Sequence, residues 1–306
     1  MKLNNEIIKQ LAKEIGFDLI GFAKAEIIND ELNLYKSWIK NAFHAGMDYM
    51  TKNIDKKKDV SKILPDVKSI ISLGINYYNN ETYHNIPQNS GKVSRYAWGL
   101  DYHIIVKRML KNLESKLNQI DKDFISVSYI DTGPIMDKVW AVKAGLGWMG
   151  KHTNVINKVF GSWFFIANIL CNYEFEYSKP INDFCGDCTA CIDHCPTNAI
   201  VAPYVVDSNK CISYQTIENK KDIPEDFKGK FEGWAFGCDI CQDVCPYNKK
   251  FSIVSDKMYF NPINKYLSLE EFNNMNEEEF RIKFKDSPIK RSKLNGIKRN
   301  LRYLFE

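Results

Sequence analysis

Seven cysteines of this 306-residue chain fall into two runs with nearly the same spacing. The runs are Cys185-x2-Cys188-x2-Cys191-x3-Cys195-Pro196 and Cys238-x2-Cys241-x3-Cys245-Pro246. Two-residue spacings let a tight loop wrap three corners of an iron–sulfur cube, and the proline turns the chain away afterwards. The two runs therefore predict a pair of 4Fe–4S clusters and a role in electron transfer.

Two clusters need eight ligands, and Cys211 can complete the shorter second run. In runs of this kind three cysteines hold one cluster and the fourth reaches across to the other. We therefore assign cluster one to Cys185, Cys188, Cys191 and Cys245. Cluster two is assigned to Cys211, Cys238, Cys241 and Cys195. The ninth cysteine, Cys171, lies in an apolar run and is interpreted as a core thiol.

Two other interpretations of the cysteines have less support from the sequence. A zinc ribbon is the main alternative, but the twice-repeated spacing that ends in proline disfavours it. Disulfides would suit a secreted protein, whereas the first residues, MKLNNEIIKQL, are polar and helical rather than a secretory leader. The most apolar run, residues 163–171, is too short to cross a membrane. We expect a cytoplasmic protein without membrane contact, in which thiols bind metal.

The rest of the chain predicts an α+β protein in three parts. Apolar periodicity indicates helices and strands that alternate through the first part, with a lysine-rich loop among them. The expected helices are 5–15, 32–42 and 101–117, the expected strands are 17–22, 69–77 and 124–130, and the loop is 52–62. The composition of the chain then changes to segments rich in cysteine and proline with short loops. We predict an α/β domain at 1–175, a ferredoxin-like domain at 176–255, and a short helical segment at 256–306.

Six sequence motifs of this chain resemble those of one enzyme family. They are RYAWGLDYH (95–103), DTGPIMDK (131–138), AGLGWMGKHT (144–153), the cysteine runs, CISYQTIE (211–218) and SPIKRSKLNGIKRN (287–300). Across nearly its whole length the chain resembles epoxyqueuosine reductases, which are cobalamin- and 4Fe–4S-dependent tRNA-modification enzymes related to reductive dehalogenases. Longer members add a helical-repeat extension at the C-terminus, so this chain is expected to be a short form.

The resemblance implies a reaction and a proton donor. Epoxyqueuosine at the wobble position of tRNA would be reduced to queuosine by cobalamin, and cobalamin would be reduced through the clusters. Asp131 would be the proton donor, and opening an epoxide does leave an alkoxide that needs a proton. Asp131 follows an expected strand and precedes the turn Thr132-Gly133-Pro134. Partial burial is expected to raise its pKa, although an aspartate before such a turn can also be only a cap.

The resemblance also implies which residues line the cobalamin. These are Lys57, Ser94, Asp131, Val155, Ser213, Cys238 and Asp239. Ser94 stands where relatives often carry a cysteine beside the cobalt, and Lys57 belongs to a lysine run that could simply be solvated. Asp101-x-His103 resembles the start of a corrinoid motif, but Val106 replaces its glycine. His103 is therefore interpreted as a satisfied structural histidine rather than a cobalt ligand.

Gly145, Gly147 and Gly150 precede Lys151 in a pattern that is neither a P-loop nor a dinucleotide fold. Two interpretations remain. The missing Cβ atoms could let the backbone approach a flat corrin closely. Alternatively, the segment is a glycine-rich turn with Trp148 in the core.

The positive charge is concentrated near the C-terminus. The chain carries a net +4, yet residues 285–302 contain seven basic residues against one acid, Asp286. The basic residues are Lys285, Lys290, Arg291, Lys293, Lys298, Arg299 and Arg302. This segment suits the phosphate backbone of tRNA, and its alternative is a solvated helix face.

Two other functions are alternatives to the reductase. One is a cobalamin-dependent, dehalogenase-like enzyme that acts on a small molecule, and such enzymes usually carry export signals. The other is a ferredoxin-type electron-carrier module, which leaves the first 175 residues without a purpose. For the reductase we expect a monomer that is charged by an external donor such as flavodoxin or ferredoxin.

Overall fold

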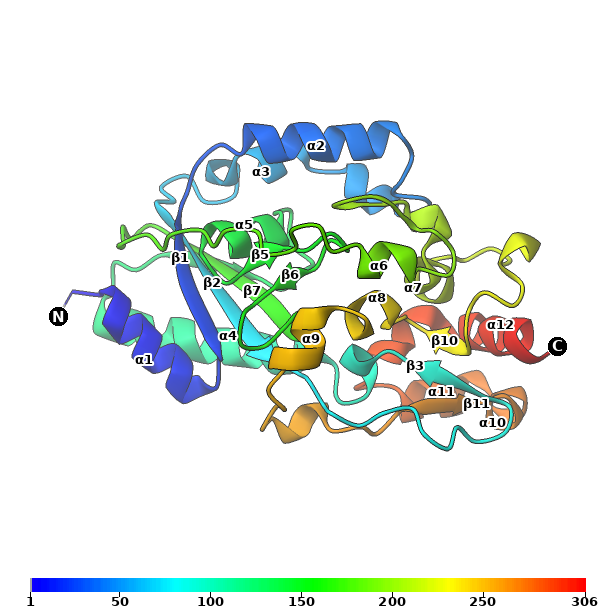
Figure 1. Ribbon diagram of the computed structural model, residues 1–306. Coiled ribbons are helices and arrows are strands. Elements are labelled where there is room, and N and C mark those ends of the chain that lie inside the picture. The colour runs from blue at the N-terminus through cyan, green and yellow to red at the C-terminus, as the bar shows by residue number, and fades with distance from the viewer. Residues whose placement is uncertain (1) are drawn as a thin grey trace.

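The computed structural model describes residues 2–306 and is built around a four-stranded antiparallel sheet (Figure 1). Its strands lie in the order β1 (Leu19–Lys24), β2 (Ser69–Asn76), β7 (Phe164–Cys171) and β4 (Ser126–Tyr129). The central strands β2 and β7 are almost continuously apolar because both of their faces are covered.

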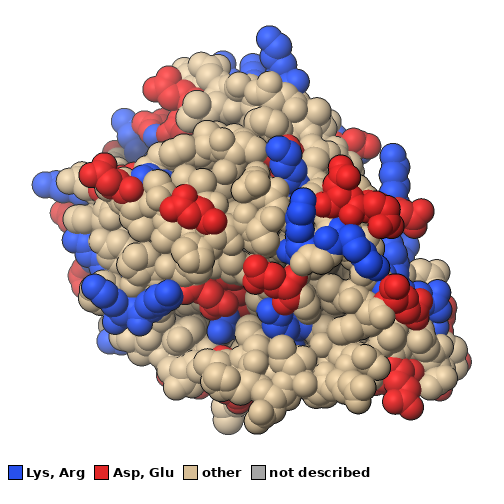
Figure 2. All heavy atoms as spheres, turned by 45° about the vertical axis from the view of Figure 1, so that its right-hand side comes forward, with Lys and Arg blue, Asp and Glu red and all other residues tan. Residues whose placement is uncertain are grey.

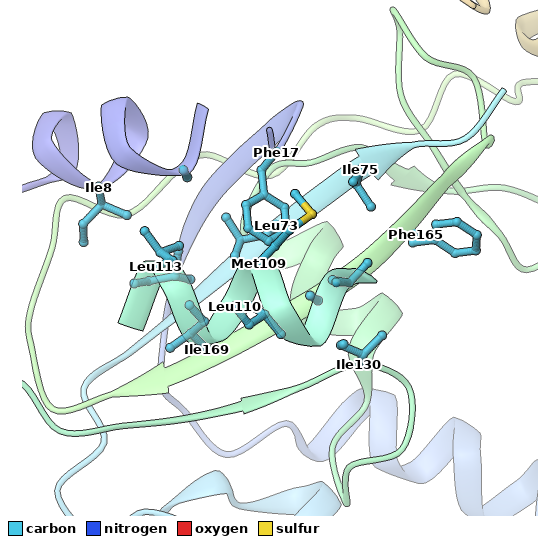
Figure 3. Packing of buried hydrophobic residues seen from close by; sticks show 14 of the residues in the cluster. Ile8, Phe17, Leu73, Ile75, Met109, Leu110, Leu113, Ile130, Phe165 and Ile169 are labelled. Carbon is cyan, nitrogen blue, oxygen red and sulfur yellow. The ribbon is translucent and has the colours of Figure 1, made fainter. Parts of the chain in front are cut away.

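Helices cover the two faces of this sheet. On one face, α1 (Asn5–Ile15) and α4 (Tyr102–Ile120) pack Ile8, Met109 and Leu113 against Leu73 and Ile169 of the strands (Figure 3). On the other face lies α5 (Asp137–Lys143) with its buried Trp140. Helices α2 (Asn29–Lys40) and α3 (Ile54–Lys58) lie beyond it (Figure 1). Each fully buried Leu or Ile contributes roughly 1.5–3 kcal/mol.

A second, three-stranded sheet joins distant parts of the chain. Its middle strand β3 (Ser90–Val93) pairs in parallel with β10 (Trp234–Phe236) and antiparallel with β11 (Tyr266–Ser268). Helices α10 (Leu269–Asn274), α11 (Glu277–Lys283) and α12 (Lys293–Phe305) close a core around this sheet. The domain boundaries expected at residues 175 and 255 stay a prediction. Through its pairing with β10 and β11, β3 connects all three of the expected parts.

The cysteine-rich segment consists of short elements. They are α6 (Ala190–Asp193), β8 (Ile200–Ala202), β9 (Val205–Val206), α7 (Ile212–Ile217), α8 (Ile240–Asp243) and α9 (Pro246–Phe251). A separate hairpin of β5 (Trp148–Met149) and β6 (Val155–Ile156) follows α5. Among residues 2–306, no helix has the length and apolar character needed to cross a lipid bilayer.

Most expected elements are present, with shifted ends. The helix expected at 5–15 is α1, which ends at Gly16 in the left-handed conformation with φ 111°. Two expectations were wrong. The lysine-rich loop 52–62 contains α3, and the C-terminal segment, expected to be helical, also contributes β11. Both elements are short and depend on packing against distant residues, which no local pattern reports.

Candidate active site and iron–sulfur centre

Four predicted ligands surround one cavity. Cys185, Cys188, Cys191 and Cys245 line a cavity of about 160 Å³ beside α6 and α9. Burial raises the pKa of the Cys191 thiol to about 11, with a further contribution from Cys245 and Cys185. Cys188 is exposed, so this cysteine set reaches the protein surface. The arrangement groups Cys245 with the first run, as the crossed assignment expects, and supports that assignment as a proposal.

The other four cysteines form a second, more enclosed group. Burial, and then the charges of Cys211 and Cys195, raise the pKa of the Cys241 thiol. Burial and Cys241 likewise raise the pKa of Cys238. Cys195 also accepts a backbone N–H from Ala199 at 3.2 Å. Cys195 therefore lies with the thiols assigned to cluster two, although it ends the first run.

Cys171 stays apart from both groups. It is fully buried in β7, and burial raises the pKa of its thiol to about 12. The interpretation as a core thiol is confirmed.

The glycine-rich segment faces protein rather than an open ligand site. A Cβ added at Gly147 would lie 2.1 Å from the carbonyl oxygen of Ile156, and one at Gly145 would lie 2.8 Å from that of Lys179. Trp148 is buried beside Cys185 and Cys245. The chain itself fills the spaces beside these two glycines, which accounts for both glycines without a corrin. The alternative, a turn with Trp148 in a core, is confirmed.

Asp131 lies directly after β4 and is held by two side chains of α4. The hydroxyl of Tyr102 donates a hydrogen bond to Oδ2 of Asp131, and Nε2 of His103 lies 2.8 Å from its Oδ1. The side chain of Asp131 is 51% exposed, so about half of it is buried. Its backbone is left-handed, with φ 46°, a conformation that a non-glycine residue keeps only when its surroundings hold it.

His103 sits between two carboxylates. Its Nδ1 lies 2.8 Å from Oδ1 of Asp101, whose Oδ2 pairs with Nζ of Lys290 at 2.8 Å. Burial alone would lower the pKa of His103, but hydrogen bonds with Asp101 and Asp131 outweigh it and raise the pKa to about 9. Both ring nitrogens are thus engaged, which agrees with the interpretation of a satisfied histidine. The charged chain runs from Lys290 through Asp101 and His103 to Asp131.

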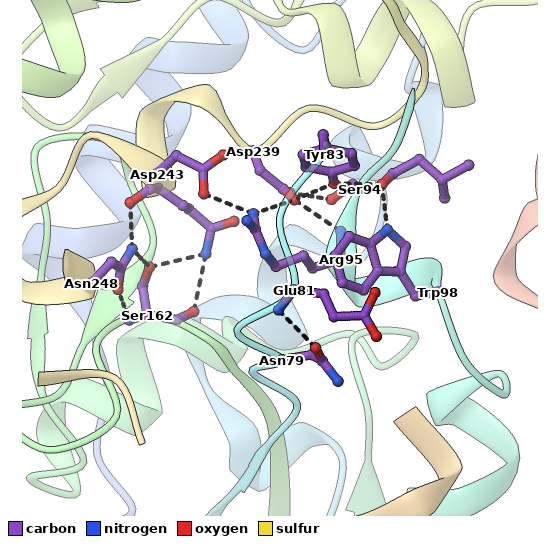
Figure 4. A network of polar contacts seen from close by, with 12 residues as sticks. Asn79, Glu81, Tyr83, Ser94, Arg95, Trp98, Ser162, Asp239, Asp243 and Asn248 are labelled. Carbon is purple, nitrogen blue, oxygen red and sulfur yellow. Dashed lines mark hydrogen bonds and ion pairs between the residues drawn. The ribbon is translucent and has the colours of Figure 1, made fainter. Parts of the chain in front are cut away.

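Ser94 and Asp239 belong to a buried network around Arg95 (Figure 4). The carboxylate of Asp239 accepts hydrogen bonds from Ser94 Oγ, from the Arg95 backbone at 2.9 Å and from Arg95 Nη1 at 3.1 Å. Arg95 also reaches Asp243 at 2.7 Å and lies over the ring of Tyr83. Both predicted residues are occupied by protein partners, and the network anchors the loop that carries Cys238 and Cys241.

The remaining predicted cofactor-lining residues are spread around the molecule. Lys57 is buried in α3 and donates to the carbonyl oxygen of Lys52 at 2.5 Å. Val155 is buried in β6. Ser213 lies in α7, two residues after Cys211, and is half-buried. Ser213 thus lies beside the second cysteine group, to which Cys238 itself belongs, whereas Lys57 and Val155 lie in other elements.

The motif that begins at Asp131 also supplies residues that sequence reasoning missed. Lys138 is exposed and donates to the carbonyl oxygen of Thr153 at 2.9 Å. Burial raises the pKa of Asp137 to about 7, although Asn168 donates a hydrogen bond to it. The sequence signal for both residues is the DTGPIMDK motif, of which they form the end.

The basic C-terminal segment is only partly free to bind an anion. Lys290 pairs with Asp101, and Arg291 pairs with Glu218. Arg299 donates hydrogen bonds to the backbone carbonyl oxygens of Gln215 and Asn219. A groove of about 620 Å³ lies beside α11, lined by Glu277, Glu278, Phe280, Arg281, Lys285, Lys290 and Lys293. Figure 2 shows basic side chains in separate groups with acidic ones between them.

The fold and the two cysteine groups define an iron–sulfur oxidoreductase that couples a double-cluster domain to a mixed α+β domain. A family model described as "4Fe-4S double cluster binding domain" matches residues 184–248. A second, described as "Epoxyqueuosine reductase QueG, DUF1730", matches residues 57–132.

The relatives extend this match to the whole chain. An epoxyqueuosine reductase from Cellulophaga algicola is 43% identical over 303 residues, covering 98% of both chains. One from Leadbetterella byssophila is 43% identical over 299 residues, covering 98% of this chain and 97% of the relative. The chain belongs to the epoxyqueuosine reductase family.

Solved structures agree with the assignment. A crystal structure of epoxyqueuosine reductase with an epoxyqueuosine-modified tRNA-Tyr stem loop superposes with a TM-score of 0.92 at 29% identity, covering 98% of this chain and 80% of that one. A Bacillus subtilis structure, with its catalytic aspartate loop swung out of the active site, has a TM-score of 0.90 at 29% identity, with the same coverage.

Proposed function

We propose that this chain reduces epoxyqueuosine to queuosine at the wobble position of tRNA, the last step of queuosine biosynthesis. The observation that carries the proposal is the full-length match to epoxyqueuosine reductases at 43% identity. It is supported by the double-cluster domain and by the solved relative that holds an epoxyqueuosine-modified stem loop. Both predict a reductase that acts on RNA rather than a free electron carrier.

The chemistry requires two electrons and two protons. Both carbon–oxygen bonds of the epoxide break, a carbon–carbon double bond forms, and the oxygen leaves as water. Asp131 is our choice for the group that gives a proton to the departing oxygen. Its position supports this, because half of its side chain is exposed while Tyr102 and His103 hold it. His103 carries a proton at neutral pH, and it can pass this proton through Asp131 to the departing oxygen.

The clusters supply the electrons in a defined order. Cys188 is exposed, so an external donor such as flavodoxin or ferredoxin would charge cluster one. Cluster two would then pass electrons on, since Lys138, in the same motif as Asp131, lies near Cys241 and Cys211. This order makes the buried group the final donor to the substrate side.

Cobalamin is the cofactor we propose for the region bounded by Asp131, Lys138 and the second cysteine group. When bound, it supplies a low-valent cobalt centre that can reduce the epoxide carbons. Ser213 and Cys238 would hold it on the cluster side and Asp131 on the opposite side. Lys57, Ser94, Val155 and Asp239 would act through the segments they anchor, since their side chains already contact protein. We further propose a cytoplasmic monomer.

The test is conversion of epoxyqueuosine-containing tRNA by the reconstituted protein with cobalamin and a reductant, followed by nucleoside mass spectrometry. The wild type is expected to form queuosine. Asp131→Asn is expected to slow conversion by about 10²–10⁴, the usual worth of a positioned acid. Asp66→Asn, an exposed aspartate outside the site, is the matched control. Unchanged epoxyqueuosine with the wild type would overturn the function, and full activity of Asp131→Asn would overturn its role.

A further inference from the structure

Aromatic side chains connect the cavity assigned to cluster one with the molecular surface. Phe184 and Tyr247 both line this cavity, and Phe184 is also 41% exposed. Each of the two rings makes an edge contact with the buried Trp148, at centroid distances of 5.3 Å and 4.7 Å. On α9, the ring of Tyr247 lies 5.7 Å from that of Phe251, which is 48% exposed. These rings form one continuous group that reaches from the surface to the cavity wall.

Two neighbouring segments extend this group into an apolar surface patch. The backbone N–H of Ser162 donates to Oδ1 of Asn248 at 2.6 Å, which holds the loop 157–161 against α9. We define the cluster-one patch as the exposed apolar residues of these segments, namely Val159, Phe184, Phe251, Ile253 and Val254. Grouped apolar side chains with a polar rim mark surfaces that bind a partner.

The rim of the cluster-one patch is basic. It carries three exposed lysines, namely Lys158, Lys249 and Lys250. The ammonium of the first lies 3.9 Å from the ring centroid of Phe184. The segments that carry the three lysines, residues 157–162 and 244–255, contain no Asp or Glu. Asp183 and Asp187 belong to the ligand loop itself, so the excess of positive charge lies on the α9 side of the patch.

We propose that the cluster-one patch is the docking surface for a small acidic protein that presents a one-electron cofactor at its own surface. The lysines attract the acidic carrier, and the apolar side chains hold it beside the cavity. The carrier loses the electron that cluster one gains, and no bond forms or breaks. Electron-transfer complexes are small and weak, which suits a patch of this kind. The inference rests on the proposed assignment of cluster one and on the proposed order of electron flow.

The experiment measures binding of oxidised flavodoxin, an acidic carrier, to the cluster-loaded full-length protein by calorimetry over a series of salt concentrations. Changing Lys158 and Lys250 together to Glu is expected to weaken binding about tenfold at low salt and to flatten its salt dependence. The control changes Lys107 and Lys111, on the exposed side of α4, to Glu. It alters the net charge equally and is expected to change binding far less.

Phe251→Ser tests the apolar part of the patch without a change in charge. It is expected to weaken flavodoxin binding about fivefold at every salt concentration. Limiting flavodoxin hydroquinone is expected to reduce its clusters about fivefold more slowly, as measured by the loss of cluster absorbance. Dithionite needs no docking surface and is expected to reduce them at the wild-type rate. Equal slowing with both reductants, equal weakening by the α4 control, or a wild type that does not bind flavodoxin would overturn the proposal.

Neither measurement involves tRNA. Impaired docking in variants of a protein that leaves epoxyqueuosine unchanged would support the inference and reject the proposed function. Unimpaired docking in variants of an active enzyme would do the reverse.

Discussion

The Nε2 atom of His103 lies 2.8 Å from the Oδ1 atom of Asp131, at the point where the start of α4 meets the end of β4. The pKa of His103 is raised from 6.5 to about 9 in the folded protein. The contribution of this pair to folding stability is therefore fully present below about pH 6.5. It is lost as the pH rises through about 9. The proton nearest to Asp131 therefore sits on His103 over the physiological range.

The pair predicts the pH dependence of the reaction. The single-turnover rate of epoxyqueuosine conversion is expected to fall as the pH rises through about 9, because His103 then loses its proton. His103→Gln cannot titrate, so it is expected to lower the rate at least about tenfold and to lose this descent. Nucleoside mass spectrometry on either side of that pH measures both effects. His84→Gln, at an exposed histidine, is the control. A descent with the same midpoint in His103→Gln would contradict the prediction.

The crossed ligand assignment predicts which cysteine variants resemble one another. Cys245→Ser is expected to alter the same cluster signal as Cys188→Ser, since both cysteines line one cavity. Cys195→Ser is expected to alter the other signal, together with Cys211→Ser. Iron content with Mössbauer and electron paramagnetic resonance spectra makes the comparison. Grouping by sequence, with Cys245 beside Cys241 and Cys195 beside Cys191, would reject the assignment.

The groove beside α11 predicts where tRNA phosphates bind. Lys285 and Lys293 line it, are exposed, and are free of the strong ion pairs that hold Lys290 and Arg291. Changing both to Gln is expected to weaken tRNA binding and to reduce the salt slope by about 2, roughly 1 for each lost contact.

Binding measured over a series of salt concentrations tests this. Lys9 and Lys13 lie on α1, at the opposite end of the molecule from α12 (Figure 1), and serve as the control pair. An unchanged slope after the groove substitutions would place the RNA elsewhere. Lys290 is a poor choice for this test, because its loss also frees Asp101.

The buried pair of Arg95 and Asp239 predicts a large effect on stability. Arg95→Met leaves the Asp239 carboxylate inside the protein without its cation, at a cost of about 3–5 kcal/mol. Thermal unfolding of the cluster-loaded protein should show a clearly lower midpoint. Arg108→Met, on the exposed side of α4, is the comparison. Equal midpoints would show that water or a neighbouring group compensates the charge.

Local spacing explains what the sequence could predict. A cluster takes its ligands at fixed short intervals, so the cysteine runs reveal their chemistry before any fold is known. The core helices are visible for the same reason, since one turn separates Met109 from Leu113 in α4. The grouping of Cys245 with Cys185 also follows from a rule about such runs rather than from long-range information.

Contacts between distant segments explain what was missed. His103 and Asp131 meet only because the sheet brings β4 beside α4, and Lys290 reaches Asp101 from the far end of the chain. The glycines of residues 145–150 show that the backbone lies close to something, but not what it is close to. Here the neighbour is the β6 strand, through Ile156. Exposure of Asp131 likewise depends on how its loop is held.

The position of β3 bears on how the protein is made. Its partners β10 and β11 leave the ribosome long after β3 itself, so the second sheet cannot form until synthesis is nearly complete. The β10 strand leads directly into Cys238, and its register against β3 places the second cysteine run. The second cysteine run is therefore positioned by a strand that is synthesised long before it, and its site can form only after β10 has left the ribosome.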